Sequence, residues 1–254
     1  MQDLERRASA AARTTEVGSE LRALPAQRPA LHHVGRALLR PLFRLYFRMR
    51  GEGLEHRPAR GPYLLAPNHV SMLDWAFLSY FLPRLTRFVV HREYYDHPIM
   101  GFGLRVNGAI PIRTDRPDLA AMRTARAVLA AGEALILFPE GNISRTGRPG
   151  VALPGIIALS SAAGVPIVPV AIRGAFEAFP RRQRLPRRRP VTVAFGAPLP
   201  PPRAGRHRHQ ELADRLMVHI TALLDGRPQP QPAWDDALTN SRPESGMGSV
   251  PPPQ

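Results

Sequence analysis

The chain has 254 residues, of which 44% are hydrophobic, so it can form one sizeable α/β domain with flanking tails. Its formal net charge is +15, and because lysine is absent every strong positive charge is an arginine. This charge favours anionic partners: nucleic acid, an anionic lipid surface or phosphorylated substrates. The absence of cysteine excludes disulfides, zinc–thiolate sites and a cysteine nucleophile.

The two ends of the chain differ from the middle in composition. Residues 1–30 are polar, rich in Ala and Arg and without sustained periodicity, which predicts a disordered N-terminal tail. No apolar run of the kind found in a secretory signal precedes residue 20. Residues 227–254 are rich in Pro, Gln and Ser, which predicts a Pro-rich disordered tail. The globular domain is therefore expected to span residues 51–226.

Residues 31–50 predict an amphipathic helix. Arginine recurs at every fourth position, at Arg36, Arg40, Arg44 and Arg48. Leucines and aromatic residues fill most other positions, and Pro41 should kink the helix. Such a helix can lie in a membrane interface, with rings and leucines in the lipid and guanidiniums at the headgroups. An ordinary amphipathic helix packed on the domain fits the same pattern, and both descriptions can hold at once.

Strand and helix patterns alternate through the rest of the chain. Each apolar run that ends at Pro, Gly or a polar cluster is expected to be a strand or a buried helix. In chain order, the sequence predicts a strand at 63–66, a helix at 72–81, a strand at 87–90, a helix at 99–106, a strand at 109–112, a helix at 119–131, a strand at 134–138, a helix at 156–163, strands at 167–172 and 191–195, and a helix at 211–224. This alternation predicts an α/β fold with a largely parallel (mixed) central sheet flanked by helices.

The uncharged run at 151–172 is long enough for a membrane span. It is interrupted by Pro154, Gly155, Gly164, Pro166 and Pro169. We therefore expect two buried elements, a helix followed by a strand.

Two of the predicted strands end in the same way, with a proline and then a polar cluster. The clusters follow strands 63–66 and 134–138 and contain Asn68 and His69 in the first and Glu140 and Gly141 in the second. In open α/β sheets, ligand sites lie beyond the carboxyl ends of strands. If these two strands are parallel neighbours, both clusters share one edge of the sheet, and the strand at 167–172 brings Arg173 to the same edge.

His69 and Asp74 are five residues apart, which on a continuous helix separates them by roughly 140°. They can meet if His69 lies in a turn and the helix starts near Ser71, which with Asp74 fits a capping box. In the functional interpretation, Asp74 accepts a hydrogen bond from one ring nitrogen of His69 and leaves the other as a base. Because no Ser or Cys nucleophile is evident, that base would activate a hydroxyl of the substrate. In the structural interpretation, Asp74 only caps a helix and His69 is a turn residue.

The second cluster also has two interpretations. Gly141 permits close approach of the backbone to a ligand, and Arg145 could bind a phosphate with its forked guanidinium. A glycine turn with solvated charges fits the same residues.

Together these blocks resemble the glycerolipid acyltransferase family of the PlsC type, which includes the 1-acylglycerol-3-phosphate and lysophospholipid acyltransferases. The resemblance covers roughly residues 50–200. It rests on Asn68-His69 with Asp74, on Phe138-Pro139-Glu140-Gly141 about seventy residues later, and on the Val-Pro-Ile-Val-Pro-Val block at 165–170.

The resemblance implies transfer of a fatty acyl group from acyl-CoA or acyl carrier protein to the free hydroxyl of a lysophospholipid. It implies that His69 is the general base and Asp74 its orienting carboxylate. It implies substrate binding by Asn68, Arg113, Glu140, Gly141 and Arg145, and no metal or redox cofactor. The expected location is the cytoplasmic face of the cell membrane, peripheral or monotopic. The sequence leaves the oligomeric state open.

This sequence departs from the family pattern in two places. Three residues, Asn142 to Ser144, stand between Gly141 and Arg145, where the family commonly has Thr-Arg directly. In the second block Arg113 comes early, and Arg116 is a competing candidate.

Other functions fit parts of the sequence. The arginine run at 181–189 could serve a membrane-surface or nucleic-acid-binding protein without catalysis, although no aromatic residues are interleaved with it. A metal hydrolase using His69 and Asp74 is a further alternative. Salt-dependent binding to duplex DNA, compared with binding to anionic vesicles, would separate the first two.

Overall fold

The computed structural model describes residues 27–98, 100–113, 115, 118–181, 183–203, 205–232 and 234. In chain order its elements are α2 (Pro29–Tyr46), β1 (Arg50–Glu52), η1 (Leu54–His56), β2 (Tyr63–Pro67), α3 (Asp74–Phe81), β3 (Arg87–His91), α4 (Arg92–Tyr95), α5 (Met100–Val106), β4 (Ile110–Ile112), α6 (Leu119–Ala130), β5 (Ala134–Ile136), α7 (Gly155–Ala163), β6 (Ile167–Arg173), α8 (Ala175–Ala178), β7 (Thr192–Phe195), η2 (Arg206–Arg208) and α9 (His209–Leu224).

The strands of this part of the chain form one seven-stranded sheet in the order β1-β7-β6-β2-β5-β3-β4. The five strands from β6 to β4 pair in parallel, whereas β6 and β7 are antiparallel. β1 pairs in parallel with β7, so these two strands run against the other five. The predicted α/β fold with a largely parallel, mixed sheet is confirmed.

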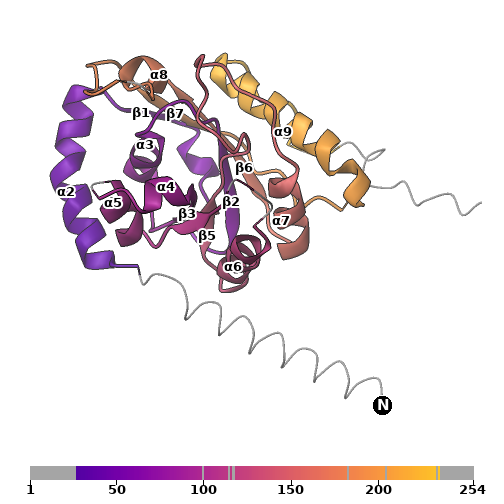
Figure 1. Cartoon of the computed structure of the whole chain (residues 1–254). Coiled ribbons are helices and arrows are strands. Elements are labelled where there is room, and N and C mark those ends of the chain that lie inside the picture. The colour runs from indigo at the N-terminus through magenta and orange to yellow at the C-terminus, as the bar shows by residue number, and fades with distance from the viewer. Residues whose placement is uncertain are drawn as a thin grey trace, which may run out of the picture.

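Helices cover both faces of the sheet, and the alternation of side chains along each strand explains why. In β2, Leu64 and Ala66 pack in one buried cluster, and Tyr63 and Leu65 pack in the other. The first cluster includes residues of α6, α7 and α9, and the second includes residues of α3, α5 and α8. Figure 1 shows the resulting three layers, with the sheet between the two groups of helices.

The centre of the sheet brings the two polar clusters together. β2 lies between β5 and β6, with Tyr63 opposite Ala134 and Ala66 opposite Pro169. Because the three strands are parallel, the segments that follow them leave the sheet at the same edge. The expected meeting of the clusters at one edge is confirmed.

Several boundaries and short elements differ from the sequence prediction. β5 ends at Ile136 rather than at residue 138, although the amide of Leu137 still donates to the carbonyl of Leu65 (3.0 Å). α3 begins at Asp74 rather than at residue 72. β1, α4 and α8 were not expected from the sequence, because these three- or four-residue elements contain no sustained apolar run. The run at 151–172 forms α7 and β6, the two buried elements expected.

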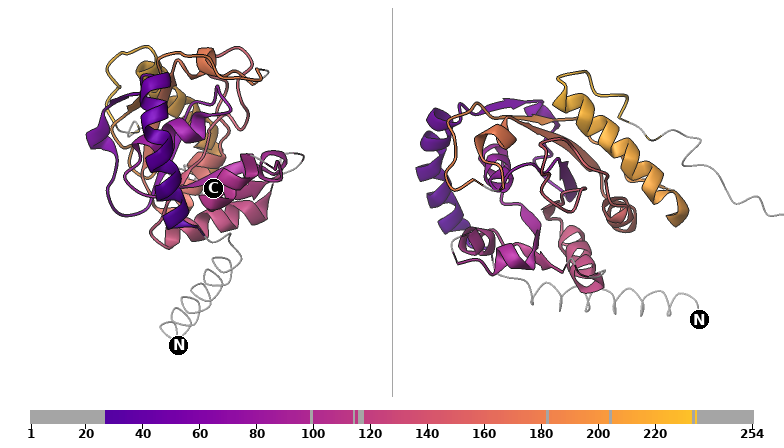
Figure 2. Two further views of the ribbon diagram at one scale, coloured as in Figure 1. Left: turned by 90° about the vertical axis from the view of Figure 1, so that its left-hand side faces the viewer. Right: turned by 45° about the horizontal axis from the view of Figure 1, so that its top comes forward.

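Helix α2 lies along the outside of the domain, on the opposite side from α9 (Figures 1 and 2). It is continuous through Pro41. Phe43, on the helix, and Phe47, directly after it, contact the ring of Phe77 in α3, with centroids 5.7 and 5.0 Å away. The leucines of α2 face outward instead. The exposed apolar side chains of α2 are Leu31, Val34, Leu38, Leu39, Leu42 and Leu45. Among the described residues, no helix is both long and apolar enough to cross a membrane.

The ordered domain continues past residue 226. The side-chain amide of Gln229 pairs with the backbone N–H and C=O of Ala197 (2.5 and 3.1 Å). The indole of Trp234 donates to the carbonyl of Pro200 (2.7 Å), and Trp234 is only 4% exposed. Part of the stretch that the sequence analysis assigns to the C-terminal tail therefore packs on the domain. Residues 233 and 235–254 of that tail, and residues 1–26 of the N-terminal one, lie outside the described residues.

The contact of α2 with the domain predicts a large cost for removing Phe77. Its side chain is completely buried, so Phe77→Ala should lower the free energy of unfolding by about 3–5 kcal/mol through lost packing and a cavity. Urea unfolding measures this change. Phe102→Ala, which removes a ring that is 55% exposed, is the matched control and should cost less than about 1 kcal/mol. Equal costs for the two variants would contradict the packing described here.

Candidate active site

The buried carboxylate of Asp74 organises the turn between β2 and α3. Its Oδ2 atom accepts three hydrogen bonds of 2.8 Å, from the ring Nδ1 of His69 and from the backbone amides of Val70 and Ser71. Asp74 is fully buried, so these donors replace the water around Oδ2, whereas Oδ1 is buried without a hydrogen bond to a described residue. Because a carboxylate accepts, Nδ1 of His69 carries the proton of this bond, and Nε2 of a neutral ring keeps its lone pair.

The capping box predicted at this turn is only half formed. The hydroxyl of Ser71 accepts from the amide of Leu73 (3.2 Å) and donates to the carbonyl of Phe179 (2.7 Å). The amide of Ser71 donates to Asp74, as in a capping box, but the Ser71 hydroxyl accepts from Leu73 and not from the amide of Asp74. Leu73, which precedes the helix, makes no side-chain cap bond. The structure therefore contains the His–Asp pair and one of the two bonds of the predicted cap.

His69 is held on all sides except one edge of its ring. The ring stacks on Phe138, with centroids 3.8 Å apart and planes 18° from parallel. The backbone amide donates to Oε1 of Glu140 (2.9 Å), and the carbonyl accepts from the amide of Ser144 (2.7 Å). The side chain is 18% exposed and lines a cavity. Within the described part of the chain, no group hydrogen-bonds to Nε2, which lies on the ring edge opposite the Asp74 bond.

Glu140 joins the two polar clusters through its carboxylate. While Oε1 accepts from His69, Oε2 accepts from the backbone amide of Gly150 (2.7 Å). Burial raises the pKa of Glu140 above its ordinary value, and the two amide donors act in the opposite direction. Glu140 is not among the residues that line the cavity, so in this structure it holds the loops that do.

Asn68, another predicted substrate-binding residue, turns toward the sheet. Its side-chain amide donates to the carbonyl of Ile172 (3.3 Å) and accepts from the amide of the same residue (2.7 Å). It is 1% exposed. The side chain thus extends the pairing of β2 with β6 beyond Pro67 and fixes the point at which His69 leaves the sheet.

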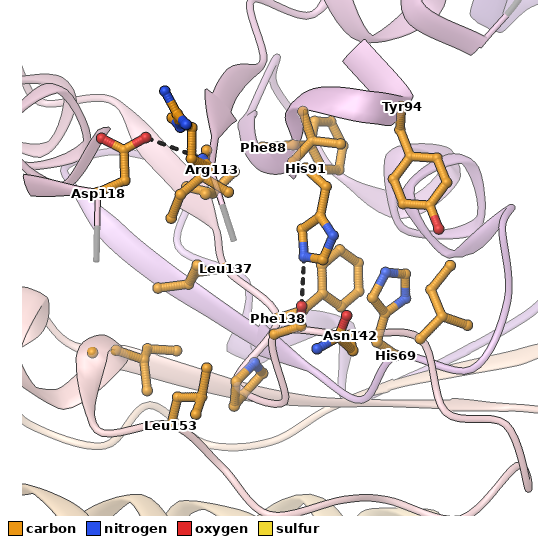
Figure 3. Close-up of a pocket in the computed structure, with 18 of the residues that line it drawn as sticks. His69, Phe88, His91, Tyr94, Arg113, Asp118, Leu137, Phe138, Asn142 and Leu153 are labelled. Atoms are coloured by element: carbon orange, nitrogen blue, oxygen red, sulfur yellow. Dashed lines mark hydrogen bonds between the residues drawn. The ribbon is translucent and has the colours of Figure 1, made fainter. Parts of the chain in front are cut away.

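A cavity of about 560 Å³ lies beside His69. Its volume is within the range of small-molecule sites. Most of its wall is apolar, and Figure 3 shows His69, Tyr94 and Asn142 on one side and Arg113 and Asp118 on the other. The apolar wall is formed mainly by Trp75, Phe88, Val90, Leu104, Ile112, Met122, Leu137, Leu153 and Ile156.

Gly141 and His91 meet at the wall of this cavity. Gly141 has a positive φ of 68°, and a Cβ there would come within 2.7 Å of Leu153 Cδ1, so the position favours glycine. Its carbonyl accepts from Nε2 of His91 (2.6 Å), as Figure 3 shows. His91 was not expected at the site, although it ends β3 and polar residues at strand ends mark ligand sites in such sheets.

The two predicted arginines occupy different places. Arg113 lines the cavity and forms a bidentate ion pair with Asp115 (3.2 and 2.9 Å). Arg145 is exposed and lies outside the cavity wall. Its side chain makes no ion pair with any residue that the structure describes. The competing candidate, Arg116, lies outside the described residues.

Two other expectations concern the rest of the edge. Arg173 reaches the end of β6 but forms an ion pair with Glu52 of β1. Among the described residues, no three His, Asp or Glu side chains are grouped closely enough to hold a metal ion.

Comparison with known proteins adds independent information. The model of a family described as Acyltransferase matches residues 48–173. The chloroplastic 1-acyl-sn-glycerol-3-phosphate acyltransferase LPAT1 of Arabidopsis thaliana is 27% identical over 139 residues, covering 53% of this chain and 38% of that protein. The 1-acyl-sn-glycerol-3-phosphate acyltransferase of Cocos nucifera is 31% identical over 153 residues, covering 58% and 48%. The matches thus span about half or less of these relatives' length.

A solved structure is similar over a larger share of both chains. The crystal structure of the 1-acyl-sn-glycerophosphate (LPA) acyltransferase PlsC from Thermotoga maritima gives a TM-score of 0.60. It covers 76% of this chain and 82% of that chain at 19% identity, which is a likeness of fold. The matched family model and the two curated relatives assign residues 48–173 to the PlsC-like glycerolipid acyltransferases, and the solved structure agrees in fold.

Proposed function

We propose that the protein is an O-acyltransferase that moves a fatty acyl group from a thioester to the free hydroxyl of a lysophospholipid such as 1-acylglycerol-3-phosphate. One observation carries the proposal: a His–Asp pair, with Asp74 completely buried, stands at an apolar cavity of about 560 Å³. The names of the two curated relatives support the same acceptor. The thioester is acyl-CoA or acyl carrier protein.

In the proposed reaction Nε2 of His69 removes the proton from the acceptor hydroxyl as its oxygen attacks the thioester carbonyl. The tetrahedral oxyanion collapses, the C–S bond breaks, and the leaving thiolate takes the proton back from the imidazolium. The products are an ester and a free thiol, so atoms and charges balance. Asp74 keeps the proton of Nδ1 in place and stabilises the imidazolium while it exists. No metal ion or redox cofactor enters these steps.

The cavity wall fits an acyl chain. Aromatic and aliphatic side chains, among them Phe88, Leu104 and Ile156, would exclude water from the chain and from the thioester carbonyl next to it. His69 is stacked on Phe138 at this wall, so its ring plane is fixed before substrate binds. Fixed geometry of this kind reduces the entropy that the reaction would otherwise lose.

Arg145 is the proposed contact for the acceptor phosphate. It directly follows Ser144, whose amide binds the carbonyl of His69, so it belongs to the same rim as the base. Its exposed guanidinium is open to a ligand, whereas that of Arg113 is already paired with Asp115. A guanidinium binds phosphate through two parallel charge-assisted hydrogen bonds.

Membrane association is part of the proposal, because both substrates are lipids or carry lipid chains. The exposed leucines of α2 offer an apolar face to a bilayer, and Leu38 and Leu45 are each 71% exposed. Amphipathic helices use such faces to lie in the membrane interface. The proposed location is the cytoplasmic face of the cell membrane, with α2 in contact with lipid.

His69→Ala should lower kcat by roughly 10²–10⁴-fold, which is the usual contribution of a positioned base. The measurement is acyl transfer to 1-acylglycerol-3-phosphate by purified protein, followed by mass spectrometry. His207→Ala removes an exposed histidine in η2 and should keep the wild-type rate. Wild-type turnover by His69→Ala would reject the mechanism, whereas absence of turnover in the wild-type protein would favour a non-catalytic role at a surface.

Arg145→Ala should raise the KM for the acceptor by roughly 10–100-fold, because a charge-assisted hydrogen bond to a charged group is lost. The KM for the thioester should change little. Arg148→Ala removes another exposed arginine of the same loop and is the matched control. An acceptor KM that is unchanged in Arg145→Ala, or raised equally in both variants, would remove the phosphate-binding role.

Glu140 gives a prediction about pH. Because burial raises its folded-state pKa above the ordinary value, the folded protein binds this proton more tightly than the unfolded chain does. The resulting stabilisation is complete below the ordinary pKa and is lost as the pH rises through the raised value. Glu140→Gln removes the titration. The Tm of wild type minus the Tm of this variant should therefore decrease as the pH rises from about 4 toward neutrality.

The exposed residue Glu177 is the matched control for that experiment. The Tm difference between wild type and Glu177→Gln should stay nearly constant over the same pH range. If the Glu140→Gln difference is equally flat, the described burial of the carboxylate between His69 and Gly150 is contradicted.

A further inference from the structure

Four arginines gather on the outside of the domain, between α2 and the C-terminal end of α3. They line an open pocket of about 680 Å³. The pocket is formed by Arg36, Arg40, Arg44 and Arg57 together with Ala37, Pro41, Met49, Leu54, Tyr80, Phe81 and Pro83. No acidic residue is in this lining. Among the described residues, none forms an ion pair with any of the four arginines.

The fold explains two of these arginines. Arg36 donates to the carbonyls of Leu82 (2.6 Å) and Tyr80 (3.3 Å). Arg57 donates to the carbonyls of Leu54 (2.7 Å) and Phe81. Apart from the bond to Leu54 in η1, these bonds satisfy carbonyl groups at the end of α3, where the helix dipole also favours positive charge. Arg36 and Arg57 therefore have a structural role.

The other two arginines have no comparable role. Arg40 lies over the ring of Tyr80, with its Cζ 5.2 Å from the ring centroid, and Arg44 is exposed. Neither side chain hydrogen-bonds to another described residue. Their N–H groups are thus available to a ligand at the mouth of the pocket.

The cluster carries positive charge that no acid of the pocket lining neutralises. Burial lowers the pKa of Arg36, and the positive charges of Arg40 and Arg57 lower it further. Glu55, outside the lining, acts on the pKa of Arg57 in the opposite direction. Like charges held together repel each other, and an anion bound among them would offset this repulsion. Phosphate is the anion whose geometry matches several guanidinium groups.

The position of the cluster on α2 indicates where that phosphate comes from. Leu38 and Leu45 lie roughly 140–160° around the helix from Arg40. An interfacial helix buries its apolar face about 5–10 Å into the boundary of headgroups and acyl chains, and a helix is about 10–12 Å thick. With the leucines in the lipid, the arginines on the other side of α2 would stand at the level of the lipid phosphates.

We propose that this arginine pocket binds the phosphate group of an anionic phospholipid of the surrounding bilayer, at a site separate from the acceptor site. This lipid-site proposal rests on the membrane contact of α2 proposed above. The two sites lie at opposite ends of α3, since Asp74 begins this helix and Tyr80 and Phe81 end it, about 10 Å further along its axis. The bound lipid would fix how the domain is rotated on the membrane.

The test is flotation of the full chain with vesicles of phosphatidylcholine alone and of phosphatidylcholine with phosphatidylglycerol. Arg40→Gln/Arg44→Gln should weaken binding to the anionic vesicles by roughly 10–30-fold, because each arginine near the surface contributes about fivefold. Binding to the neutral vesicles should be unchanged. The charge-matched control, Arg126→Gln/Arg203→Gln, removes two exposed arginines outside the pocket and should lose less than about threefold.

Leu38→Gln/Leu45→Gln separates this proposal from the membrane contact on which it rests. It should weaken binding to both kinds of vesicle. If it has no effect, or if wild type floats with neither vesicle, the leucine face is not a membrane contact and the lipid site falls with it. Turnover of a water-soluble short-chain acceptor should be wild-type in both double variants, so a failure of the proposed catalysis would be seen independently.

Three results would overturn the arginine site itself. One is equal loss of anionic-vesicle binding in Arg40→Gln/Arg44→Gln and in the charge-matched control, which would assign binding to net charge. In another, inorganic phosphate stabilises wild type but not Arg40→Gln/Arg44→Gln, while the two proteins bind vesicles equally well. That result would indicate that the pocket binds free phosphate. The last is loss of duplex DNA binding in the pocket variant alone, which would indicate a nucleic acid.

Discussion

A single buried oxygen atom controls the geometry of the turn that carries His69. Oδ2 of Asp74 accepts from two backbone amides and from the ring of His69, so the turn, the start of α3 and the imidazole are positioned by the same charge. Charge-assisted bonds of this kind are stronger than neutral ones and are costly to break when buried. The position of the histidine is thus linked to the stability of the local fold, which leaves the ring little freedom to turn.

The order of the strands supplies the second constraint. β2 pairs with both β5 and β6, so the segments after these three strands emerge together although they are distant in the sequence. Asn68 continues the β2–β6 pairing with its side chain, and Glu140 connects the segment after β5 to the segment after β2. Polar side chains here act as extensions of the sheet, and the cavity forms where that pairing stops.

Much of this arrangement could be predicted from the sequence. Two apolar runs that end in proline and polar residues located the edge of the sheet, and the spacing of His69 and Asp74 required a turn that the structure contains. The family resemblance agreed with both features. The direction of β7 and β1 could not be predicted, because short strands carry no sign of the direction in which they pair.

The hydrogen-bond partners of individual polar side chains could not be predicted from the sequence either. Asn68 and Glu140 are residue types that often bind ligands. Their hydrogen bonds go instead to the backbone of Ile172, His69 and Gly150, and no pattern of side chains in the sequence predicts such partners. The same holds for the arginine stripe of α2. Its four-residue spacing indicated one helix face, yet only the tertiary structure brings Arg36 to the carbonyls at the end of α3.

The loop after β5 is fastened to the histidine turn at two points, through the Glu140 carboxylate and through the Ser144 amide. Any displacement of that loop by an arriving acceptor must pull on the main chain of His69 on both sides of its Cα atom. A ligand that moves the loop would therefore also move the imidazole ring. If His69 is the base proposed above, an acceptor that fits poorly would misalign it, and selectivity would then appear in turnover as well as in affinity.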